Sequence, residues 1–561
     1  MKNCILGFLL AALVAACSST PQPKSGSVTA NKLADPKAYK EQIEVIPASS
    51  SLPERWWESA VFYEVFVRAY YDSSGDGHGD IQGLIAKLDY LQDLGVTGLW
   101  LMPVTESEFN SNGYDVKNIR DIEQVYGSME DFQQLIDEAH QRGIGVIMDF
   151  VVNHSSSANP IFQDAVRNPE SKYRDWFIWA DSDLGWGRPW DRSASVWHPS
   201  EHGYYYGLFF DFLPDWNFRN PEVVAYMKDS AKFWLNMGVD GFRVDAASHL
   251  IENGDGAQEN QPDNHLFYAE FRQLINQYPN AFIVAEAPFT GDMYMGDGSN
   301  EFHSAFCFKC SQKLIYGVKN SSKRAVQSYL SMVNSAPEGA NFATLLSNHD
   351  PFAGERTATA MKGNLDKAKF AASLMLTGPG IPFVYYGEEI GMTLIDRSLV
   401  PWDDAVARIP MQWDASDNAG FTAGNSWRNV NPNYPQINVA QQVEDPDSML
   451  SHYQKLISLR NQHPALASGE FELLKTTGSS SRHSIAFLRK HSDETLLVAV
   501  NLSDEEIVAG VKLAGASLAN KQIKLGKELL SGISSNEHVA NQELKLNIPA
   551  YSIKVFSLSF N

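Results

Sequence analysis

The sequence has 561 residues, of which 44% are hydrophobic and 20% charged, and its formal net charge at pH 7 is −22. A chain of this length and ordinary globular composition is long enough for a large folded core with further domains attached to it. The excess of acidic residues argues against nucleic acid and against an anionic lipid surface as partners, because both would repel the chain.

The first 17 residues, MKNCILGFLLAALVAAC, are typical of a secretory signal. Lys2 precedes an apolar run that is too short to span a bilayer, and small residues follow up to Cys17. The ending VAAC (14–17) resembles the bacterial lipoprotein box, which implies cleavage after residue 16 and lipidation of the Cys17 thiol. Because Ser18 rather than Asp follows, the resemblance further implies an anchor in the outer membrane, on its periplasmic or outer face. An ordinary signal peptide with an incidental cysteine is the alternative.

Residues 17–53 follow the leader and are predicted to be a tether. They are rich in Ser, Pro, Lys and Ala and show no hydrophobic periodicity, which is typical of a segment without a packed core. We therefore expect the protein to lie in the cell envelope and to contact the membrane through its lipid anchor only. We also expect it to be a monomer.

One unit recurs along residues 54–465: an amphipathic helix that leads into an apolar strand. In SMEDFQQLIDEAHQRG (128–143), Ser128 is a predicted N-cap and the apolar residues share one face; GVIMDFVVNH (145–154) follows as a strand. Apolar strands without alternation are typical of a parallel sheet that is buried on both faces. Eight such units predict an α/β fold, a closed (β/α)8 TIM barrel, with a doubly wound open sheet as the alternative. The eight strands are expected within 61–70, 96–103, 145–154, 239–246, 281–288, 303–308, 341–350 and 381–389.

Two segments interrupt or follow this pattern. Residues 155–216, between the third strand and the next helix, are aromatic and Gly-rich and predict an inserted loop-rich domain, so that the barrel comprises 54–154 and 217–465. Residues 466–561 change to short alternating segments, which predict a C-terminal antiparallel β-sandwich. Three tryptophans of the insertion are either sugar-binding platforms or ordinary core residues: Trp186, Trp190 and Trp197.

Outside the leader and the lipoprotein box the chain holds two cysteines, Cys307 and Cys310, in the sequence CFKC. They are able to form a small disulfide in an oxidising compartment, but two cysteines cannot make a zinc site. We expect incidental packing rather than a disulfide.

Four acidic residues lie at, or within a residue or two of, the carboxyl end of a predicted strand. In a barrel these strand ends meet at one mouth, where the active sites of the architecture lie. Carboxylates that share a pocket push each other's pKa values apart, which leaves one ionised nucleophile and one protonated acid, as glycoside hydrolysis requires. Arg243 and Asp245 are two apart on one strand and share a face; a purely structural ion pair is the alternative for them. The polar residues predicted to gather there are Asp149, Asp245, Glu286, Asp350, His154, Arg243 and His349.

The motifs that carry these residues resemble the four ordered sequence regions of the α-amylase family, glycoside hydrolase family 13. The matching stretches are DFVVNH (149–154), GFRVDAASH (241–249), VAEAP (284–288) and LSNHD (346–350), and NGYDV (112–116) and LPDWN (213–217) are similar to two further family signatures. The resemblance runs from about residue 54 to the C-terminus. It implies that residues 155–216 are the family's domain B, which walls one side of the cleft.

The resemblance also implies a role for each residue. Asp245 would be the nucleophile, Glu286 the general acid/base, and Asp350 the group that stabilises the transition state. Arg243 would keep Asp245 ionised. The remaining residues would hold the sugar in the −1 subsite, where the bond is cut: Tyr114, His154 and His349.

Two metal sites are predicted, both for Ca²⁺. The loop DSSGDGHGD (72–80) places oxygen donors at alternate positions with Gly77 at the turn, as calcium loops do, but Gly83 stands where an EF-hand would have its glutamate. Oligo-1,6-glucosidase-like members of the family carry a similar loop that binds a divalent ion; a plain polar turn is the alternative. The loop's donors would be Asp72, Ser74, Asp76, the His78 carbonyl and Asp80. By the resemblance, a second calcium would be held by Asn153, Asp215 and the carbonyl of His249.

The expected activity is endo-acting hydrolysis of α-1,4-glucosidic bonds in α-glucans and maltooligosaccharides. Exo-acting α-glucosidases of the family carry an aspartate three residues before the NGYD tyrosine, where this chain has Ser111, which leaves room for a sugar at −2. RIPMQWDASDNAGF (408–421) resembles the exo-acting members instead. An exo-acting α-glucosidase, an oligo-1,6-glucosidase or a transglycosylating relative is therefore the alternative. A catalytically dead binding or transporter-associated module is the non-enzyme alternative, although all three carboxylates are present.

Overall fold

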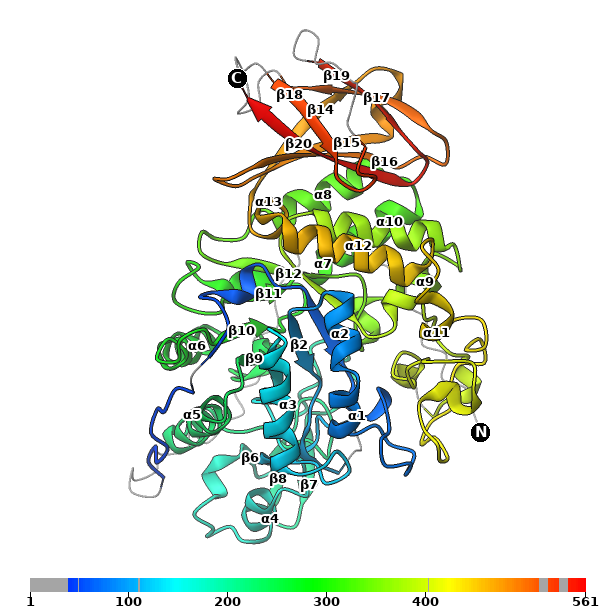
Figure 1. The fold of residues 1–561 in the computed structure, drawn as a ribbon. Coiled ribbons are helices and arrows are strands. Elements are labelled where there is room, and N and C mark those ends of the chain that lie inside the picture. Colours follow the sequence, from blue (N-terminus) through cyan, green and yellow to red (C-terminus); the bar gives the residue numbers. More distant parts are fainter. Residues whose placement is uncertain are drawn as a thin grey trace.

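The structure, a computed structural model, describes residues 39–48, 50–108, 111–401, 403–513, 523–533 and 543–560. Three parts lie along the molecule in Figure 1: the C-terminal strands at the top, the barrel in the middle, and a small sheet from the inserted segment at the bottom. The signal peptide, Cys17 and the first part of the predicted tether lie outside the described residues. Among the residues described, no helix is long and apolar enough to cross a membrane.

A closed barrel of eight parallel strands forms the centre. Its strands are β1 (Phe62–Val65), β2 (Gly98–Leu101), β5 (Gly145–Phe150), β9 (Gly241–Val244), β10 (Phe282–Ala285), β11 (Ser304–Phe306), β12 (Asn341–Leu345) and β13 (Ile381–Tyr385). Around the barrel their order is β1-β13-β12-β11-β10-β9-β5-β2. Because β1 pairs with both β2 and β13, the sheet has no free edge. The predicted barrel is confirmed, and the open doubly wound sheet is excluded.

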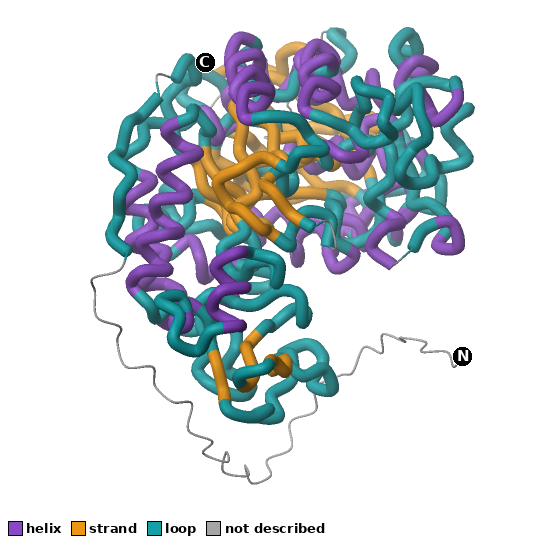
Figure 2. The backbone as a smooth tube through the Cα atoms, turned by 90° about the horizontal axis from the view of Figure 1, so that it is seen from below, coloured by secondary structure: helices purple, strands orange, loops and turns teal. Residues whose placement is uncertain are grey.

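Helices cover the outside of the barrel, as Figure 2 shows, with the strands in orange at the centre. The helix over 129–141 begins as predicted: the Ser128 side chain accepts from the Asp131 N–H, and the Asp131 side chain accepts from the Ser128 N–H, a complete capping box. The main helices are α1 (Ile81–Ala86), α2 (Leu88–Leu94), α3 (Met129–Gln141), α5 (Pro221–Asn236), α6 (Pro262–Ile275), α7 (Phe308–Lys319), α8 (Lys323–Val333), α10 (Leu365–Thr377) and α12 (Met449–Gln462).

Large apolar side chains fill the barrel interior and close its amino-terminal end. The rings of Phe62 and Phe383 stack with centroids 4.4 Å apart. Trp56 precedes β1 and lies against the start of β5, where a Cβ on Gly145 would come within 2.5 Å of the indole ring. This end of the barrel therefore has no room for a substrate, and the polar residues gather at the opposite, carboxyl end.

The inserted segment forms a small three-stranded sheet, β6 (Trp179–Ala180), β8 (Gly203–Tyr206) and β7 (Trp197–Ser200), with helix α4 (Pro160–Arg167) beside it. Trp197 is buried in the core of this unit, and Trp186 packs against that core. Trp190 is different, because 54% of its surface is exposed.

The C-terminal region is antiparallel throughout, as predicted. Its strands are β14 (Glu470–Thr477), β15 (Ser484–Lys490), β16 (Thr495–Asn501), β17 (Ile507–Lys512), β18 (Ile523–Glu528), β19 (Glu543–Ile548) and β20 (Ser552–Phe560). The first half of β14 pairs with β15 and its second half with β17, so β14 passes from one layer to the other. Leu488 and Leu497 of the first layer share one core with Val511 and Leu546 of the second, which makes a two-layer sandwich.

Residues 39–48 of the predicted tether are packed against helix α5. The Tyr39 hydroxyl donates to Asp229 at 2.9 Å, and the Gln42 N–H donates to the same carboxylate at 2.7 Å. Asp229 is fully buried, so these donors satisfy a carboxylate that would otherwise be costly to bury. The described part of this segment is therefore packed structure rather than free tether.

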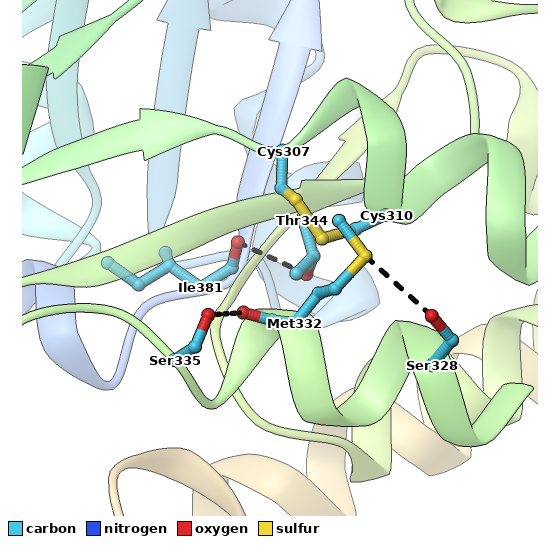
Figure 3. Close-up of a disulfide and its surroundings, with 7 residues drawn as sticks. All are labelled: Cys307, Cys310, Ser328, Met332, Ser335, Thr344 and Ile381. Atoms are coloured by element: carbon cyan, nitrogen blue, oxygen red, sulfur yellow. Dashed lines mark hydrogen bonds between the residues drawn. A yellow bond between two sulfur atoms is a disulfide. The ribbon is translucent and has the colours of Figure 1, made fainter. Parts of the chain in front are cut away.

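Cys307 and Cys310 form a disulfide, which corrects the expectation of incidental packing (Figure 3). Cys307 is the N-cap of α7, and the Cys310 N–H donates to the Cys307 carbonyl at 2.9 Å. This first helical turn brings the two Cα atoms to 5.1 Å, which is within the range that a disulfide needs. The bond joins the end of β11 to the start of α7.

Candidate active site

Four strands of the barrel, β5, β9, β10 and β12, bring the predicted polar residues together at their carboxyl ends. Asp149 and Arg243 are partners in the register of β5 and β9. Asp245 follows β9 directly and Glu286 follows β10 directly, while Asp350 lies five residues beyond β12. The short parallel strands thus deliver side chains that are far apart in the sequence to one mouth.

Arg243 is the centre of this cluster. Its Nη1 donates to Asp149 at 2.7 Å and to Asp245 at 2.5 Å, and its Nη2 lies 2.8 Å from Glu286. Only 1% of Arg243 is exposed. Burial opposes its charge, but the carboxylates of Asp149 and Glu286 outweigh burial and raise the pKa of the guanidinium well above its usual value. One permanent cation therefore compensates three buried carboxyl groups.

The carboxyl groups around Arg243 do not titrate alike. Burial raises the pKa of Glu286 to about 7, with Arg243 acting in the opposite direction. Burial also raises the pKa of Asp245 to about 6, where Arg243 again opposes and Asp149 adds to the rise. The expected upward shift of Glu286 is found. For Asp245 the effect of Arg243 is smaller than that of burial, so its pKa lies above the usual aspartate value although below that of Glu286.

The environment of Asp350 lowers the pKa of its carboxyl group instead of raising it. His349 Nε2 lies 3.1 Å from one of its oxygens, and Arg408 Nη2 donates to the other at 3.0 Å. Burial would raise the pKa of Asp350, but these two cations outweigh burial and hold it well below the usual range. Burial opposes the charge on His349, yet Asp350 and Glu64 together raise its pKa to about 9. Asp350 is thus a fixed negative charge beside a protonated imidazole.

Glu64 and Arg408 were missed by the sequence reasoning. Glu64 Oε1 lies 2.5 Å from His349 Nδ1, on the far side of the ring from Asp350. A glutamate inside the apolar stretch VFYEVF was the available signal for it. Arg408 opens the RIPMQWD segment that had been singled out, but its partner Asp350 is 58 residues away and follows another strand.

Tyr114 and His154 also lie in the cluster. The Tyr114 hydroxyl donates to Asp149 at 3.1 Å and lies 2.7 Å from His349 Nε2. His154 Nε2 lies 3.1 Å from the Tyr114 carbonyl, and burial lowers the pKa of His154 to about 4, so its ring is neutral. Every predicted catalytic and sugar-holding residue therefore lies in this one constellation.

The loop 72–80 offers oxygen atoms, but its carboxylates are already engaged within the protein. Asp72 accepts from the N–H groups of Gly75 and Gly77, each at 2.7 Å. Asp80 caps helix α1 by accepting from the Gly83 N–H at 2.5 Å. The Asp76 carboxylate accepts from the His78 N–H at 2.8 Å. Among the described residues no group of three or more His, Cys, Asp or Glu side chains is placed to hold a metal ion. Calcium at this loop stays a prediction.

Asn153 and Asp215 of the second predicted metal site are in contact. Asn153 Nδ2 donates to Asp215 at 3.0 Å, while Asn153 Oδ1 is buried without a hydrogen-bond partner. Burial raises the pKa of Asp215 well above the usual value. A buried amide oxygen and a buried carboxylate are ligands that Ca²⁺ prefers, so these two residues fit the predicted ion.

A closed (β/α)8 barrel whose mouth holds three carboxyl groups on one guanidinium is an arrangement that suits glycoside hydrolysis. The family model described as "Alpha amylase, catalytic domain" matches residues 64–469. The α-amylase 3 of Dictyoglomus thermophilum is 37% identical over 80% of this chain and 86% of that protein. The oligo-1,6-glucosidase of Parageobacillus thermoglucosidasius is 34% identical over 80% of this chain and 91% of that protein. The crystal structure of an α-amylase from H. orenii matches with a TM-score of 0.76 and 34% identity, over 90% of this chain and all of that one. The chain belongs to the α-amylase family of glycoside hydrolases.

The two raised pKa values predict a bell-shaped pH dependence of kcat/KM. With Asp245 as the predicted nucleophile, which must be ionised, and Glu286 as the predicted acid, which must be protonated, activity should fall below about pH 6 and above about pH 7. His349, with its pKa of about 9, should stay protonated through this range. Initial rates on maltoheptaose between pH 4.5 and 9 measure both limbs of the profile. The two apparent pKa values belong to the coupled pair of Asp245 and Glu286 and not to either residue alone. A profile that stays flat from pH 5 to 8 would contradict these assignments.

Proposed function

We propose that the enzyme hydrolyses α-1,4-glucosidic bonds inside starch-type glucans and maltodextrins, with retention of the anomeric configuration. The observation that carries the proposal is the bridge through Arg243, whose two terminal nitrogens lie 2.5 Å from Asp245 and 2.8 Å from Glu286. Two carboxyl groups on one guanidinium suit the separation of about 5–5.5 Å that a retaining pair needs better than the wider gap of an inverting pair.

In the proposed first step, the Asp245 carboxylate attacks C1 of the sugar in the −1 subsite. The bond from C1 to the leaving oxygen breaks while Glu286 gives that oxygen its proton. In the second step Glu286 takes a proton from water, whose oxygen attacks C1 and displaces Asp245. Glu286 ends protonated and Asp245 ionised, as both began. The higher pKa of Glu286 supports this division of roles.

Asp350 and its neighbours are proposed to stabilise the transition state. As the C1–O bond breaks, positive charge develops on the sugar ring. The Asp350 carboxylate, kept ionised by His349 and Arg408, is a fixed negative charge for that transition state and an acceptor for ring hydroxyls. Because both cations are already bonded to Asp350, the site needs little rearrangement when the charge appears.

Two features support cleavage inside the chain. The Ser111 hydroxyl donates to Asp115 at 3.1 Å, so its short side chain is tied to its own turn. Beside that turn lies a depression of about 390 Å³ whose lining includes Asn112, Leu399 and Arg428. A sugar at −2 and beyond would find space there, next to the −1 subsite.

An exo-acting α-glucosidase, or a transglycosylating relative, is the second candidate. It is favoured by Arg408 of the RIPMQWD segment, which resembles the exo-acting members and donates to Asp350. The Arg408 carbonyl in turn accepts from Arg428, which also donates to Asn112. This chain of contacts borders the side of the site where endo-acting and exo-acting enzymes are expected to differ. The 34% identity to an oligo-1,6-glucosidase supports the same candidate.

A maltoheptaose blocked at its non-reducing end separates the two candidates. We expect it to be cut, and unblocked maltoheptaose to give maltose and maltotriose before glucose, in a time course followed by chromatography. A D245N variant, which should lose several orders of magnitude in turnover, shows that the cleavage is the enzyme's own. If the blocked substrate stays intact while p-nitrophenyl α-glucoside is hydrolysed readily, the enzyme is exo-acting.

The envelope location and the calcium sites are also proposed. The leader and its VAAC ending support a lipid anchor in the outer membrane. The oxygen donors of the loop 72–80, and the buried Asn153 and Asp215, support Ca²⁺ as a structural ion. No catalytic step depends on it.

Calcium binding predicts that chelation lowers the melting temperature. An ion that binds only the folded state stabilises it by RT ln(1 + [L]/Kd), so its removal by EDTA should shift the thermal melt downward. A D76A variant should show a smaller EDTA shift, and D292A, which changes an exposed aspartate in the short helix Gly291–Met295, should respond like the wild type. Identical wild-type melts with and without prolonged EDTA dialysis would exclude calcium as a stabilising ion.

A further inference from the structure

Of the three tryptophans singled out in the insertion, Trp190 is the one that the small domain's core does not use. Trp197 is buried and Trp186 packs against the same core, whereas 54% of Trp190 is exposed. A large exposed indole is an apolar surface that a sugar ring can cover, and aromatic side chains line many ligand sites.

Ring contacts connect Trp190 to the catalytic cluster. Its ring lies 5.4 Å from that of Phe209 and 5.7 Å from that of His249. Phe209 in turn lies 5.4 Å from His154, whose other side contacts the Tyr114 carbonyl. A chain of ring contacts therefore connects the exposed indole to His154 of the predicted −1 subsite.

The contacts of Glu286 show on which side of the cleaved bond this surface lies. One carboxylate oxygen of Glu286 accepts from the Ala246 N–H at 3.0 Å, and its carbonyl accepts from the Ala247 N–H at 2.9 Å. The same short turn carries His249, whose N–H donates to the Ala246 carbonyl at 2.9 Å. The turn that contacts Glu286 therefore also carries His249, whose ring lies next to that of Trp190. Arg408 belongs to the loop that follows β13, which lies on the other side of the barrel from β9.

We propose that Trp190 and Phe209 form the platform for the glucosyl units on the leaving-group side of the scissile bond, at subsites +1 and +2. The inference rests on the proposed function, because it assumes that Glu286 protonates the leaving oxygen. The apolar face of a glucose ring would pack on the indole, and its hydroxyls would point outward to water. The platform would select substrates with at least one further sugar after the cleaved bond.

Substrates with and without a leaving sugar test the platform. Maltoheptaose fills the leaving-group side, whereas α-glucosyl fluoride places only fluoride there. For W190A we expect the ratio of kcat/KM on maltoheptaose to kcat/KM on α-glucosyl fluoride to fall roughly three- to tenfold, the size of a lost aromatic contact. W190F, which keeps an aromatic ring, should restore most of the ratio. Transfer of glucose from the fluoride to added maltose should fall with the same pattern.

F210A is the matched control, because Phe210 is an exposed aromatic residue of the same segment whose ring stacks on Phe212 instead. It should keep the wild-type ratio, and thermal melts report whether each variant is folded. An unchanged ratio in W190A, or an equal loss on both substrates, would overturn the platform. If the wild type hydrolyses neither substrate, the proposed function itself is wrong, and that result is distinct from a failure of the platform alone.

Discussion

The buried guanidinium of Arg243 is the interaction on which the rest of this site depends. Taking several carboxylates out of water is unfavourable, and removing one partner of a buried pair costs about 3–5 kcal/mol. Asp149, Asp245 and Glu286 all contact Arg243, so each is compensated by the same cation. Arg243 offsets the unfavourable burial only in part, and the pKa values of Asp245 and Glu286 are therefore still raised. In the proposed mechanism, those raised values provide one acid and one nucleophile near neutral pH.

The barrel supplies the rigidity that this arrangement needs. Aromatic stacking fills its interior and Trp56 covers its amino-terminal end, so the polar residues meet only at the carboxyl end. The second charge group, Asp350 with His349 and Arg408, comes from loops that follow β12 and β13 and faces the first group across the mouth. In the proposed mechanism, the first group does the covalent chemistry and the second presents a fixed negative charge to the transition state.

Much of this could be predicted from the sequence, because the signals are local. Apolar runs that alternate with amphipathic helices indicated the barrel, and the residues directly after each strand indicated the site. Other features depend on packing between segments that are distant in the chain. The pairing of Glu64 with His349 spans 285 residues, and that of Arg408 with Asp350 joins two irregular loops. The contact of Tyr39 with Asp229 joins residues that are 190 apart in the chain, so composition and spacing did not indicate it. The CFKC spacing permitted a disulfide, but the bond depends on Cys307 lying at the N-cap of α7.

The central claim is that Asp245 and Glu286, held close by one arginine, act as nucleophile and acid rather than as base and acid. Proton NMR of maltoheptaose hydrolysis, recorded before the product anomers interconvert, tests it most directly. A nucleophilic Asp245 inverts C1 twice, so the first product signal should be that of the α-anomer. If the β-anomer appears first, water attacks C1 directly, and the role given to Asp245 is wrong.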